Sequence, residues 1–588
     1  MYVKKAAYWI LAVPVLLGVL TTGVTATADS PPAVYHHYFG QLHNHTKHSR
    51  SDQEYDPTDF GTPAEACTWA RYTAGMDFFA VTDHSVFYYN DMGDWWRPPD
   101  YPWTESNPWT FDGGWNDIKS VESDVGADPP GCNDPGNFVA IGAYEMTWDP
   151  ASKIGHINMF NTAEFATTRD PWRDINPRLN QTYNPANLDP ALDFAVNQGD
   201  PFNYKSVVEY DPAFTGLQNY YRYLPTLADP PDRSTWPIGQ FNHPGRSDCT
   251  FNQFDYWTPE IDKTMTLIEV GNKNDRYDYY YDIALSQGWH LAPTNGHDNH
   301  SGYPHSDNGY RTVVLAESLT RENIYDALRC RRVYSTEISD FKLTYTVNGQ
   351  PMGSIINYEM PSALDFEISI DSDKITSGTV SKVTVISGSS RGFESVFTEN
   401  LTGNSGVSFT LNNPKRGYYY VRIETGDAKR LTLSAPVWIE APQTVIMRID
   451  RKSAVVNGSR VEIAGGLTPV FSAEGRTMVP FRFLGESLDA GVKWDNNLGS
   501  VIVKYRGDTV VVPIDQYYIM FNGKRIPIDA PARLIDINGT LRTFVPLRAV
   551  AEILGFVAKY DANTGTIVVS EREIDLQQCV ADYKKIAG

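Results

Sequence analysis

The stretch Phe78-Phe79-Ala80-Val81-Thr82-Asp83-His84 is an apolar run that ends in an acid and a histidine. An unbroken apolar run of this length predicts a strand that is buried on both faces, as in a parallel sheet. A helix is expected directly before it, because Thr62-Pro63-Ala64-Glu65 is a capping box with proline at the first helical position, and Gly75 provides a helix end. A helix followed by a buried strand is the repeating unit of an α/β fold.

The same pattern continues on both sides of this stretch. Five further runs predict strands, and each ends at a histidine, a carboxylate or a polar loop: residues 38–43, 138–143, 238–242, 265–270 and 290–294. Strands that end in such residues, with helices between them, favour an α/β barrel whose site lies at the carboxyl ends of the strands.

The length, the charge and the first residues set broad limits. A chain of 588 residues exceeds one hydrophobic core, so about three to five domains are expected. A formal net charge of −21 disfavours nucleic-acid binding.

The first residues predict a cleaved signal peptide at residues 1–28, with a membrane anchor as the alternative. The pattern consists of Lys4 and Lys5, an apolar run over residues 6–24, and Ala26-Thr27-Ala28. We therefore expect a secreted chain without a membrane segment after cleavage. Its five cysteines are odd in number and widely spaced, which predicts no disulfide framework.

The pattern changes after the last of the twelve histidines, His305. Imidazole is the commonest metal ligand and acid–base group near neutral pH, so the chemistry is assigned to residues 36–336. Short alternating strands predict an immunoglobulin-like β-sandwich at residues 339–440. Residues 444–571 contain an internal repeat, because the sequence at 476–482 returns at 542–548.

This duplicated module resembles the copper amine oxidase N-terminal domain, a stalk module of exported proteins. No copper site is expected in it, because the region contains no histidine. The resemblance implies a spacer or a contact with the cell wall. Residues 572–588 are interpreted as a C-terminal tail.

Ligand-type residues recur at the predicted strand ends. His43 and His45 form an H-x-H pair whose side chains point to one face of a strand, since side chains alternate with a period of two. Alone, the pair also fits a solvent-exposed polar strand end. Four more strand ends carry His, Asp or Glu, in Thr82-Asp83-His84, Tyr144-Glu145, Asn242-His243 and Asp298-Asn299-His300, and Gly155-His156 opens a strand. Buried groups of this kind need partners, and shared cations would satisfy all of them.

The order of these motifs resembles that of the PHP (polymerase and histidinol phosphatase) superfamily. The motifs are H-x-H, T-D-H, a strand-end Glu, G-H, H-P and D-x-H. The amino-acid sequence at residues 40–46, 80–85, 144–148 and 240–245 is similar to that of an exported branch of this superfamily, which includes carbaryl (carbamate) hydrolases. The resemblance covers about residues 38–336. It implies a multidomain α/β protein with a distorted (β/α)7 barrel that holds two or three divalent metal ions, Zn, Mn or Fe.

The resemblance also implies a ligand set. The first metal would be held by His43, His45, Glu145 and Asp298, and Glu145 would bridge to a second metal that is completed by His156 and His243. The third metal would take His84, His300 and one residue from the loop after His45. That loop departs from the family pattern, so Asp52 is the predicted ligand, with His48 second and Asp56 or Asp59 as further alternatives.

Several neighbours of these ligands are assigned supporting roles. Asp83 is expected to orient a loop or an imidazole, and Glu269 is a candidate to hold a ligand from behind. His297 is a candidate outer group or proton shuttle. Arg246 is a candidate clamp for an anionic substrate, with a structural salt bridge as the alternative.

The predicted function is a secreted metal-dependent phosphoesterase. Bridged cations lower the pKa of a bound water to about 7 and polarise the scissile bond, so no Ser-His-Asp triad is needed. Hydrolysis of carboxylic or carbamate esters on the same site is the nearest alternative. A non-catalytic surface protein is the alternative from another class. The expected partner is a small-molecule or polymer ester.

Overall fold

The structure is a computed structural model of the chain. It describes residues 34–49, 61–85, 113–148, 153–163, 216–227, 232–300, 308–357, 360–390, 392–472, 474–505 and 508–588. The predicted signal peptide and the candidate ligands Asp52, Asp56 and Asp59 lie outside these residues. Within them, no helix is both long enough and apolar enough to cross a membrane.

The first sheet of the histidine-rich region contains the stretch that opened the sequence analysis. Its strands are β1 (His36–Gln41), β2 (Phe78–Val81), β3 (Val139–Gly142), β10 (Arg311–Ala316) and β11 (Val333–Thr336). β1, β2 and β3 are parallel, while β10 and β11 are antiparallel to their neighbours. Every residue of β2 and β3 is buried, as the apolar runs predict.

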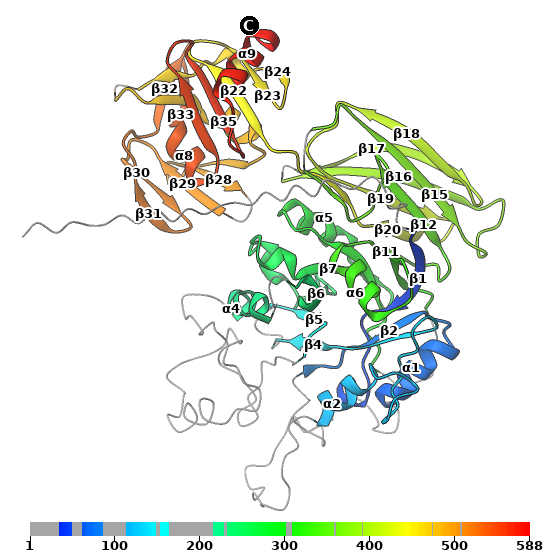
Figure 1. The fold of residues 1–588 in the computed structure, drawn as a ribbon. Coiled ribbons are helices and arrows are strands. Elements are labelled where there is room, and N and C mark those ends of the chain that lie inside the picture. The colour runs from blue at the N-terminus through cyan, green and yellow to red at the C-terminus, as the bar shows by residue number, and fades with distance from the viewer. Residues whose placement is uncertain are drawn as a thin grey trace, which may run out of the picture. The chain divides into compact units, whose positions relative to one another are not determined.

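A second sheet completes this region. Its strands are β4 (Tyr144–Thr147), β5 (His156–Phe160), β6 (Ile238–Asn242), β7 (Met265–Asn272), β8 (Asp275–Arg276) and β9 (Ala292–Gly296). β4 to β7 follow one another across the sheet (Figure 1), and β6, β7 and β9 run parallel. An isolated bridge between His84 and Glu145 connects the two sheets. Closure of these strands into a (β/α)7 barrel stays a prediction.

Helices cover the outer faces of these strands. α1 (Pro63–Tyr72) packs on β2, α2 (Gly113–Ser120) on β3, α5 (Asp278–Ser286) on β7 and α6 (Arg321–Arg329) on β10. The predicted capping box is present, because the Thr62 side chain accepts the Glu65 amide and the Glu65 carboxylate accepts the Thr62 amide. The described part of this region also contains α4 (Gly216–Tyr223) and short 3-10 turns at Lys47–Ser49, Leu224–Leu227, Arg233–Thr235, Phe251–Phe254 and Ile261–Lys263.

The next region is built of two β layers. One is a separate antiparallel sheet of β12 (Lys342–Val347), β13 (Gln350–Pro351), β15 (Ala363–Asp371) and β18 (Gly406–Asn412). The other contains β14 (Ile355–Ile356), β16 (Val380–Ser389), β17 (Gly392–Thr402), β19 (Gly417–Thr425), β20 (Arg430–Ser434) and β21 (Val437–Ile439). Burial in β15 alternates from residue to residue, which is the period of a strand with one face on a core.

The second of these layers is continuous with the first sheet of the histidine-rich region. β20 pairs with β11, so that Tyr334 lies opposite Ser434 in one 11-stranded sheet. Residues of both regions also share one apolar cluster, in which Val313 and Tyr334 occur together with Tyr345 and Val421. The two regions are therefore joined by backbone hydrogen bonds as well as by packing.

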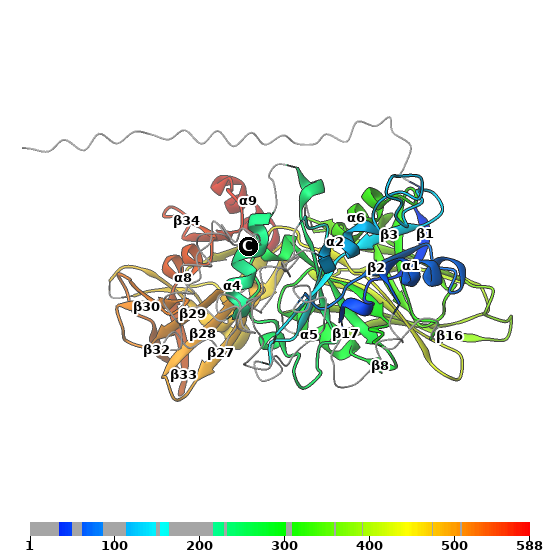
Figure 2. The same ribbon diagram turned by 90° about the horizontal axis from the view of Figure 1, so that it is seen from below.

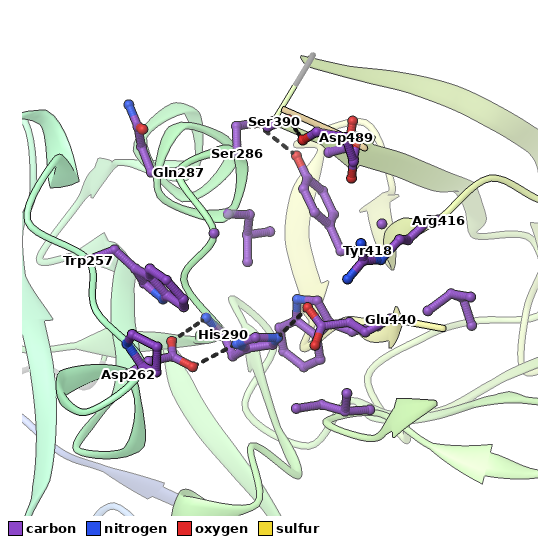
Figure 3. A pocket seen from close by; sticks show the side chains of 18 of the residues that line it. Trp257, Asp262, Ser286, Gln287, His290, Ser390, Arg416, Tyr418, Glu440 and Asp489 are labelled. Carbon is purple, nitrogen blue, oxygen red and sulfur yellow. Dashed lines mark hydrogen bonds and ion pairs between the residues drawn. The ribbon is translucent and has the colours of Figure 1, made fainter. Parts of the chain in front are cut away.

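An ionic triad lies at the same junction, in which His290 and Asp262 are buried and Glu440 is partly exposed. His290 donates or accepts at both ring nitrogens, with Nδ1 2.7 Å from Oδ2 of Asp262 and Nε2 3.1 Å from Oε1 of Glu440 (Figure 3). Trp257, His290 and Trp438 line a pocket of about 520 Å³ at this place. None of the candidate metal ligands lines this pocket.

The duplicated module consists of short antiparallel strands and two short helices. The two repeats meet where β26 (Thr477–Pro480) pairs with β33 (Thr540–Pro546), and each strand leads directly into a helix, α7 (Phe481–Ser487) or α8 (Leu547–Ile553). Figure 2 shows β27, β28 and β29 side by side in this module. The other elements are β22 (Thr444–Arg448), β23 (Ser453–Val456), β24 (Ser459–Glu462), a 3-10 turn at Ala464–Gly466, β25 (Val470–Phe471), β27 (Gly491–Asp495), β28 (Ser500–Tyr505), β29 (Asp508–Pro513), β30 (Tyr518–Phe521), β31 (Lys524–Pro527), β32 (Arg533–Ile537), β34 (Val557–Asp561) and β35 (Thr566–Ser570).

The C-terminal residues form a helix that the sequence analysis left as a tail. α9 (Leu576–Ile586) begins at Asp575, whose carboxylate accepts the amides of Gln577 and Gln578. Its buried face, with Cys579 and Tyr583, packs against β22, β23 and β35. The tail is thus part of the duplicated module's structure.

Candidate metal centre

The H-x-H pair lies just beyond the end of β1. β1 ends at Gln41, two residues before the predicted strand end, and His43 and His45 follow in irregular backbone. Both imidazoles are buried, and their Nε2 atoms are 3.2 Å apart. The expected convergence of the two side chains therefore holds, although a loop rather than a strand produces it.

Other strand ends bring their ligand-type residues to the same place. Among the described residues, five groups have ligand atoms within 4.8 Å of one another, and four of them consist of predicted ligands: His43, His45 and Asp298; His43, Glu145 and His243; His84, Glu145 and His156; and His45, His84 and His300. We call these eight residues the histidine cluster. Its members come from both sheets, and most are buried.

The register of the second sheet aligns three of these positions. Thr147 of β4 lies opposite His156 of β5, which in turn lies opposite Asn242 of β6, the residue before His243. Asn242 donates a hydrogen bond from Nδ2 to Oε1 of Glu145, 2.8 Å away. Antiparallel pairing of β4, β5 and β6 is therefore what places Glu145, His156 and His243 together.

The outer nitrogens of two imidazoles are held by acceptors. Nδ1 of His43 is 2.8 Å from Oε1 of Glu269, and Nδ1 of His300 is 3.0 Å from the backbone oxygen of Asp298. A carboxylate and a carbonyl only accept hydrogen bonds, so each Nδ1 carries its proton. In the neutral ring, Nε2 is then a free lone pair that faces the cluster.

Three further imidazoles have the same arrangement with hydroxyl or thiol partners. Nδ1 of His45 is 2.7 Å from Ser49 Oγ, Nδ1 of His84 is 2.8 Å from Thr147 Oγ1, and Nδ1 of His243 is 3.2 Å from Cys249 Sγ. The Nε2 atoms of His84 and His300 are 3.1 Å apart. The cluster thus gathers acceptor atoms around a shared space.

The carboxylates add negative charge to this space. Oε1 of Glu145 is 3.2 Å from His43 Nε2, and Oδ1 of Asp298 is 3.1 Å from His45 Nε2. The second oxygen of Glu145, Oε2, is buried and lies 2.5 Å from Nδ1 of His84, and the buried Oδ2 of Asp298 faces two cationic side chains at 3.5 and 3.7 Å. A buried set of imidazoles and carboxylates is suited to divalent cations and fits Zn, Mn or Fe.

The pKa values reflect this concentration of charge. Burial raises the pKa of Glu145, but the imidazoles of His156, His84 and His43 outweigh it and hold the pKa well below its usual range. Burial likewise raises the pKa of Asp298, and His43 and His300 bring it well below the usual value. The two carboxylates are therefore ionised at neutral pH.

The imidazoles respond in both directions. Burial lowers the pKa of His43, but Glu269, Asp298 and Glu145 outweigh it and raise the pKa well above its usual range. Burial and the neighbouring imidazoles of His300 and His84 lower the pKa of His45 well below its usual range. Opposite shifts in adjacent rings show how closely the charges of the cluster are coupled.

Backbone strain marks two of the ligand positions. His243 and Asp298 have φ values of 30° and 46°, although neither is glycine. Such conformations are costly and persist where the surrounding structure holds them in place. Gly296 shows how tightly this region is packed, because a Cβ there would lie 2.0 Å from Oε1 of Glu269.

Two of the predicted supporting residues lie where their roles require. The Asp83 carboxylate accepts the backbone amide of Thr46 and its hydroxyl at 2.5 and 2.6 Å, which holds the loop after H-x-H. Glu269 contacts His43, and its Oε2 also accepts the backbone amide of His243 at 2.7 Å. Their predicted functions remain predictions, but the geometry matches them.

The remaining predicted residues are placed less centrally. Nε2 of His48 is 2.7 Å from Oδ2 of Asp117 on α2, and His48 belongs to none of the ligand groups formed by the described residues. His297 also belongs to none of them, and its Nε2 is 2.7 Å from Oδ1 of Asn308. Nη1 of Arg246 is 3.7 Å from Oδ2 of Asp298, at the edge of the cluster.

The structure adds residues that the sequence analysis missed. Lys273 follows β7 and places Nζ 3.5 Å from Oδ2 of Asp298. Asp248 and Cys249 form a further ligand-type group with His156. The turn at His243-Pro244-Gly245 could have indicated Asp248 and Cys249 from the sequence. In this turn the amide of Gly245 donates a hydrogen bond to the carbonyl of Cys249, which brings Cys249 back to His243.

Comparisons with known proteins give one family match. The copper amine oxidase N-terminal domain matches residues 455–569, which confirms the resemblance stated for the duplicated module. No curated protein matches the chain. The resemblance to carbaryl hydrolases finds no support in these comparisons.

One solved structure is similar to the chain at a low level. It is a two-domain protein from Bacteroides vulgatus that contains a predicted PHP-like metal-dependent phosphoesterase. The two chains are 14% identical, with a TM-score of 0.31, and the match covers 69% of this chain and 97% of that one. At this TM-score a common fold is not established.

Proposed function

We propose that residues 36–336 are a metal-dependent hydrolase that cleaves ester bonds, with phosphoesters as the preferred class. The observation that carries the proposal is the histidine cluster. In it, Nε2 of His43 lies 3.2 Å from Glu145 and Nε2 of His45 lies 3.1 Å from Asp298, and the Nε2 atoms of His84 and His300 face each other. Burying so many ionisable side chains costs free energy, and such groups are therefore typical of functional sites. A purely structural role would be served more cheaply by apolar packing.

The residue groups suggest how two or three ions would be held. His43, His45 and Asp298 would hold one ion, and Glu145, His156 and His243 a second, with Glu145 close enough to both groups to bridge them. His84 and His300 would contribute to a third position. When bound, such ions would lower the pKa of coordinated water and polarise the ester. Glu269, Ser49 and Cys249 would fix the orientation of the ligand rings.

Two cationic side chains beside the cluster favour an anionic substrate over a neutral one. Arg246 and Lys273 both face Oδ2 of Asp298, and their side chains are 42% and 51% exposed. They therefore present positive charge to solvent beside the carboxylate end of the cluster. A phosphoryl group carries charge that both can pair with, whereas a carbamate or simple carboxylic ester is neutral.

The test is a hydrolysis screen with defined metals. The purified chain would be loaded with Zn, Mn or Fe, its bound metal measured, and p-nitrophenyl phosphate, bis-p-nitrophenyl phosphate and p-nitrophenyl acetate offered in turn. We expect at least two equivalents of metal per chain, because Glu145 and Asp298 each lie at the centre of a group of ligand-type residues. We also expect faster hydrolysis of a phosphate ester than of the acetate. His36→Ala is the matched control, because His36 is exposed and outside the cluster.

Each other outcome points to a different function. Preference for the acetate would favour a carboxylic or carbamate ester hydrolase. Metal binding without hydrolysis of any ester would favour a non-catalytic surface protein. A folded chain that binds no metal would overturn the proposal.

We also propose that the chain is exported after cleavage behind Ala28, and that the duplicated module acts as a spacer or a cell-wall contact. The first residues carry the pattern of a signal peptide, and the duplicated module has no buried imidazole. N-terminal sequencing of secreted protein would test the cleavage position.

A further inference from the structure

A row of polar side chains crosses the second sheet beside Glu145. In the strand register, Glu145 of β4 lies opposite Asn158 of β5, and Asn158 lies opposite Gln240 of β6. Asn242 comes two residues after Gln240, so it belongs to the same face of β6. All four side chains are fully buried, with 0% exposure. Polar groups that are buried this deeply need hydrogen-bond partners.

The three amide side chains of this row form one line of hydrogen bonds, which we call the amide network. Thr294 Oγ1 of β9 donates to Gln240 Oε1 at 3.0 Å, and Gln240 Nε2 donates to Asn242 Oδ1 at 3.0 Å. Asn242 Nδ2 donates to Asn158 Oδ1 at 2.8 Å, and Asn158 Nδ2 donates to the backbone carbonyl of Leu42 at 3.0 Å. The network therefore connects β9, β6 and β5 with the segment that follows β1.

The end of the network at Leu42 fixes the orientation of its amides. A backbone carbonyl only accepts hydrogen bonds, so Asn158 turns its Nδ2 to Leu42 and its Oδ1 to Asn242. Asn242 then turns its Nδ2 toward Asn158, and the same Nδ2 lies 2.8 Å from Oε1 of Glu145. An ionised carboxylate also only accepts, so the two N–H groups of Asn242 meet one acceptor each.

Glu145 faces ligand groups on two sides. It belongs to one group with His43 and His243 and to another with His84 and His156. Its Oε1 is 3.2 Å from Nε2 of His43, and its Oε2 is 2.5 Å from Nδ1 of His84. A turn of the carboxylate about its last side-chain bond would take both oxygens out of these positions. A hydrogen bond at Oε1 opposes that turn.

The amide of Asn242 differs from the imidazoles near Glu145 in how it responds to a cation. An imidazole nitrogen that gives its lone pair to a cation cannot donate a hydrogen bond from the same atom. An amide nitrogen has no lone pair to give, so Asn242 keeps both N–H groups. It is therefore a donor to Glu145 that persists when the neighbouring imidazoles serve as ligands.

We propose that Asn242 is a positioning residue, whose amide holds Glu145 in the orientation in which the carboxylate faces both ligand groups. This inference rests on the proposed metal site. Removing a hydrogen-bond partner from behind a ligand costs about 10–100-fold in metal affinity or activity. Gln240 and Thr294 hold Asn242 in place, so a weaker effect of the same kind is expected for them.

Zinc binding to variants of the full chain tests the proposal. Asn242→Ala removes the amide, and Asn242→Leu removes it while nearly keeping the side-chain volume. Equilibrium dialysis against Zn²⁺ with elemental analysis would give the affinity and the stoichiometry. We expect both variants to bind Zn²⁺ about 10–100-fold more weakly and to regain the wild-type stoichiometry at excess Zn²⁺. Glu145→Ala, which removes a ligand, should not regain it.

Asn133→Ala is the matched control for the loss of a buried amide. Asn133 is 4% exposed, and its Nδ2 donates to Oδ1 of Asp124 at 2.7 Å, outside the histidine cluster. This variant should lower the Tm, because it breaks a buried hydrogen bond, and leave the affinity for Zn²⁺ unchanged. It therefore separates a structural role of a buried amide from a positioning role.

Thr294→Val keeps the test open if neither Asn242 variant folds. Valine has nearly the shape of threonine, and the change releases only the far end of the amide network. It should weaken Zn²⁺ binding by a smaller factor. Wild-type affinity in a folded Asn242 variant, or in Thr294→Val when no Asn242 variant folds, would overturn the role of Asn242. A wild-type chain that binds no Zn²⁺ would overturn the proposed function and this inference with it.

Discussion

Residues 36–336 and the duplicated module at residues 444–571 are both rich in short strands, yet they bury different kinds of side chain. Within the described residues, the first region buries many charged groups and imidazoles, among them His43, Glu145, Glu269 and Asp298. In the described part of the module, Asp561 is the one buried charged residue, and the rest of its interior is apolar or carries hydroxyls. Apolar burial stabilises a fold by itself, whereas buried charge costs free energy and needs a reason. The difference favours the first region as the location of the proposed metal site.

The largest expected effect comes from removing a charge that the first region buries. Asp298→Ala or His43→Ala should lower the metal content and reduce ester hydrolysis by roughly 1,000-fold or more, because each takes a ligand from a shared site. Elemental analysis and initial rates on the best ester would measure this. Arg482→Ala, on an exposed position of α7, is the control from the duplicated module and should leave both unchanged. An Asp298→Ala protein with full metal and full activity would contradict the assignment.

A smaller effect is expected at the edge of the cluster. Arg246→Ala or Lys273→Ala should raise the KM for a phosphate ester by about tenfold, since each removes one half-exposed charge that can pair with the phosphoryl group. The KM for p-nitrophenyl acetate should stay the same, because that ester is neutral. Equal losses on both esters would instead assign Arg246 and Lys273 to holding Asp298 in place.

The smallest effect concerns stability, at the junction between the first region and the β layers that follow it. Burial lowers the pKa of His290, but Asp262 and Glu440 outweigh it and raise the pKa from 6.5 to about 9. A raised folded-state pKa stabilises the protein fully below pH 6.5, and this stabilisation is lost as the pH rises through 9. We expect about 3 kcal/mol to be lost over that range.

Urea titrations at several pH values would measure this loss. His290→Gln and Glu440→Gln should both flatten the dependence between pH 6.5 and 9. The duplicated module has no histidine and cannot contribute to the change in this way. A wild-type free energy of unfolding that does not change over this range would contradict the role of the triad.

The sequence predicted the histidine cluster more closely than it predicted the fold around it. His43, His84, Glu145, His243 and Asp298 were found because each follows or belongs to a short buried strand, and strand ends are visible in one dimension. The partners that orient the rings were harder to find. Thr147 and Cys249 carry no pattern of their own, and Lys273 reaches Asp298 only through the turn after β7.

The boundary after Thr336 was the least visible feature from the sequence. The predicted secondary structure changes from alternating helices and strands to strands alone, which suggested separate domains at residues 36–336 and 339–440. In the structure, β11 pairs with β20, and Arg276 forms an ion pair with Glu337 at 2.6 Å. A side-chain pattern shows which face of a strand is buried, but it does not identify which distant strand will lie beside it.

The pairing of β1 with β10 has a consequence for the order in which the protein is made. β1 is synthesised well before its partner β10, which begins at Arg311, and β11 is synthesised well before its partner β20, which begins at Arg430. At about 5–20 residues per second, tens of seconds pass between the synthesis of β1 and that of β10, whereas β2, the other neighbour of β1, follows within seconds. The sheet therefore cannot be completed while the early part of the chain is being synthesised.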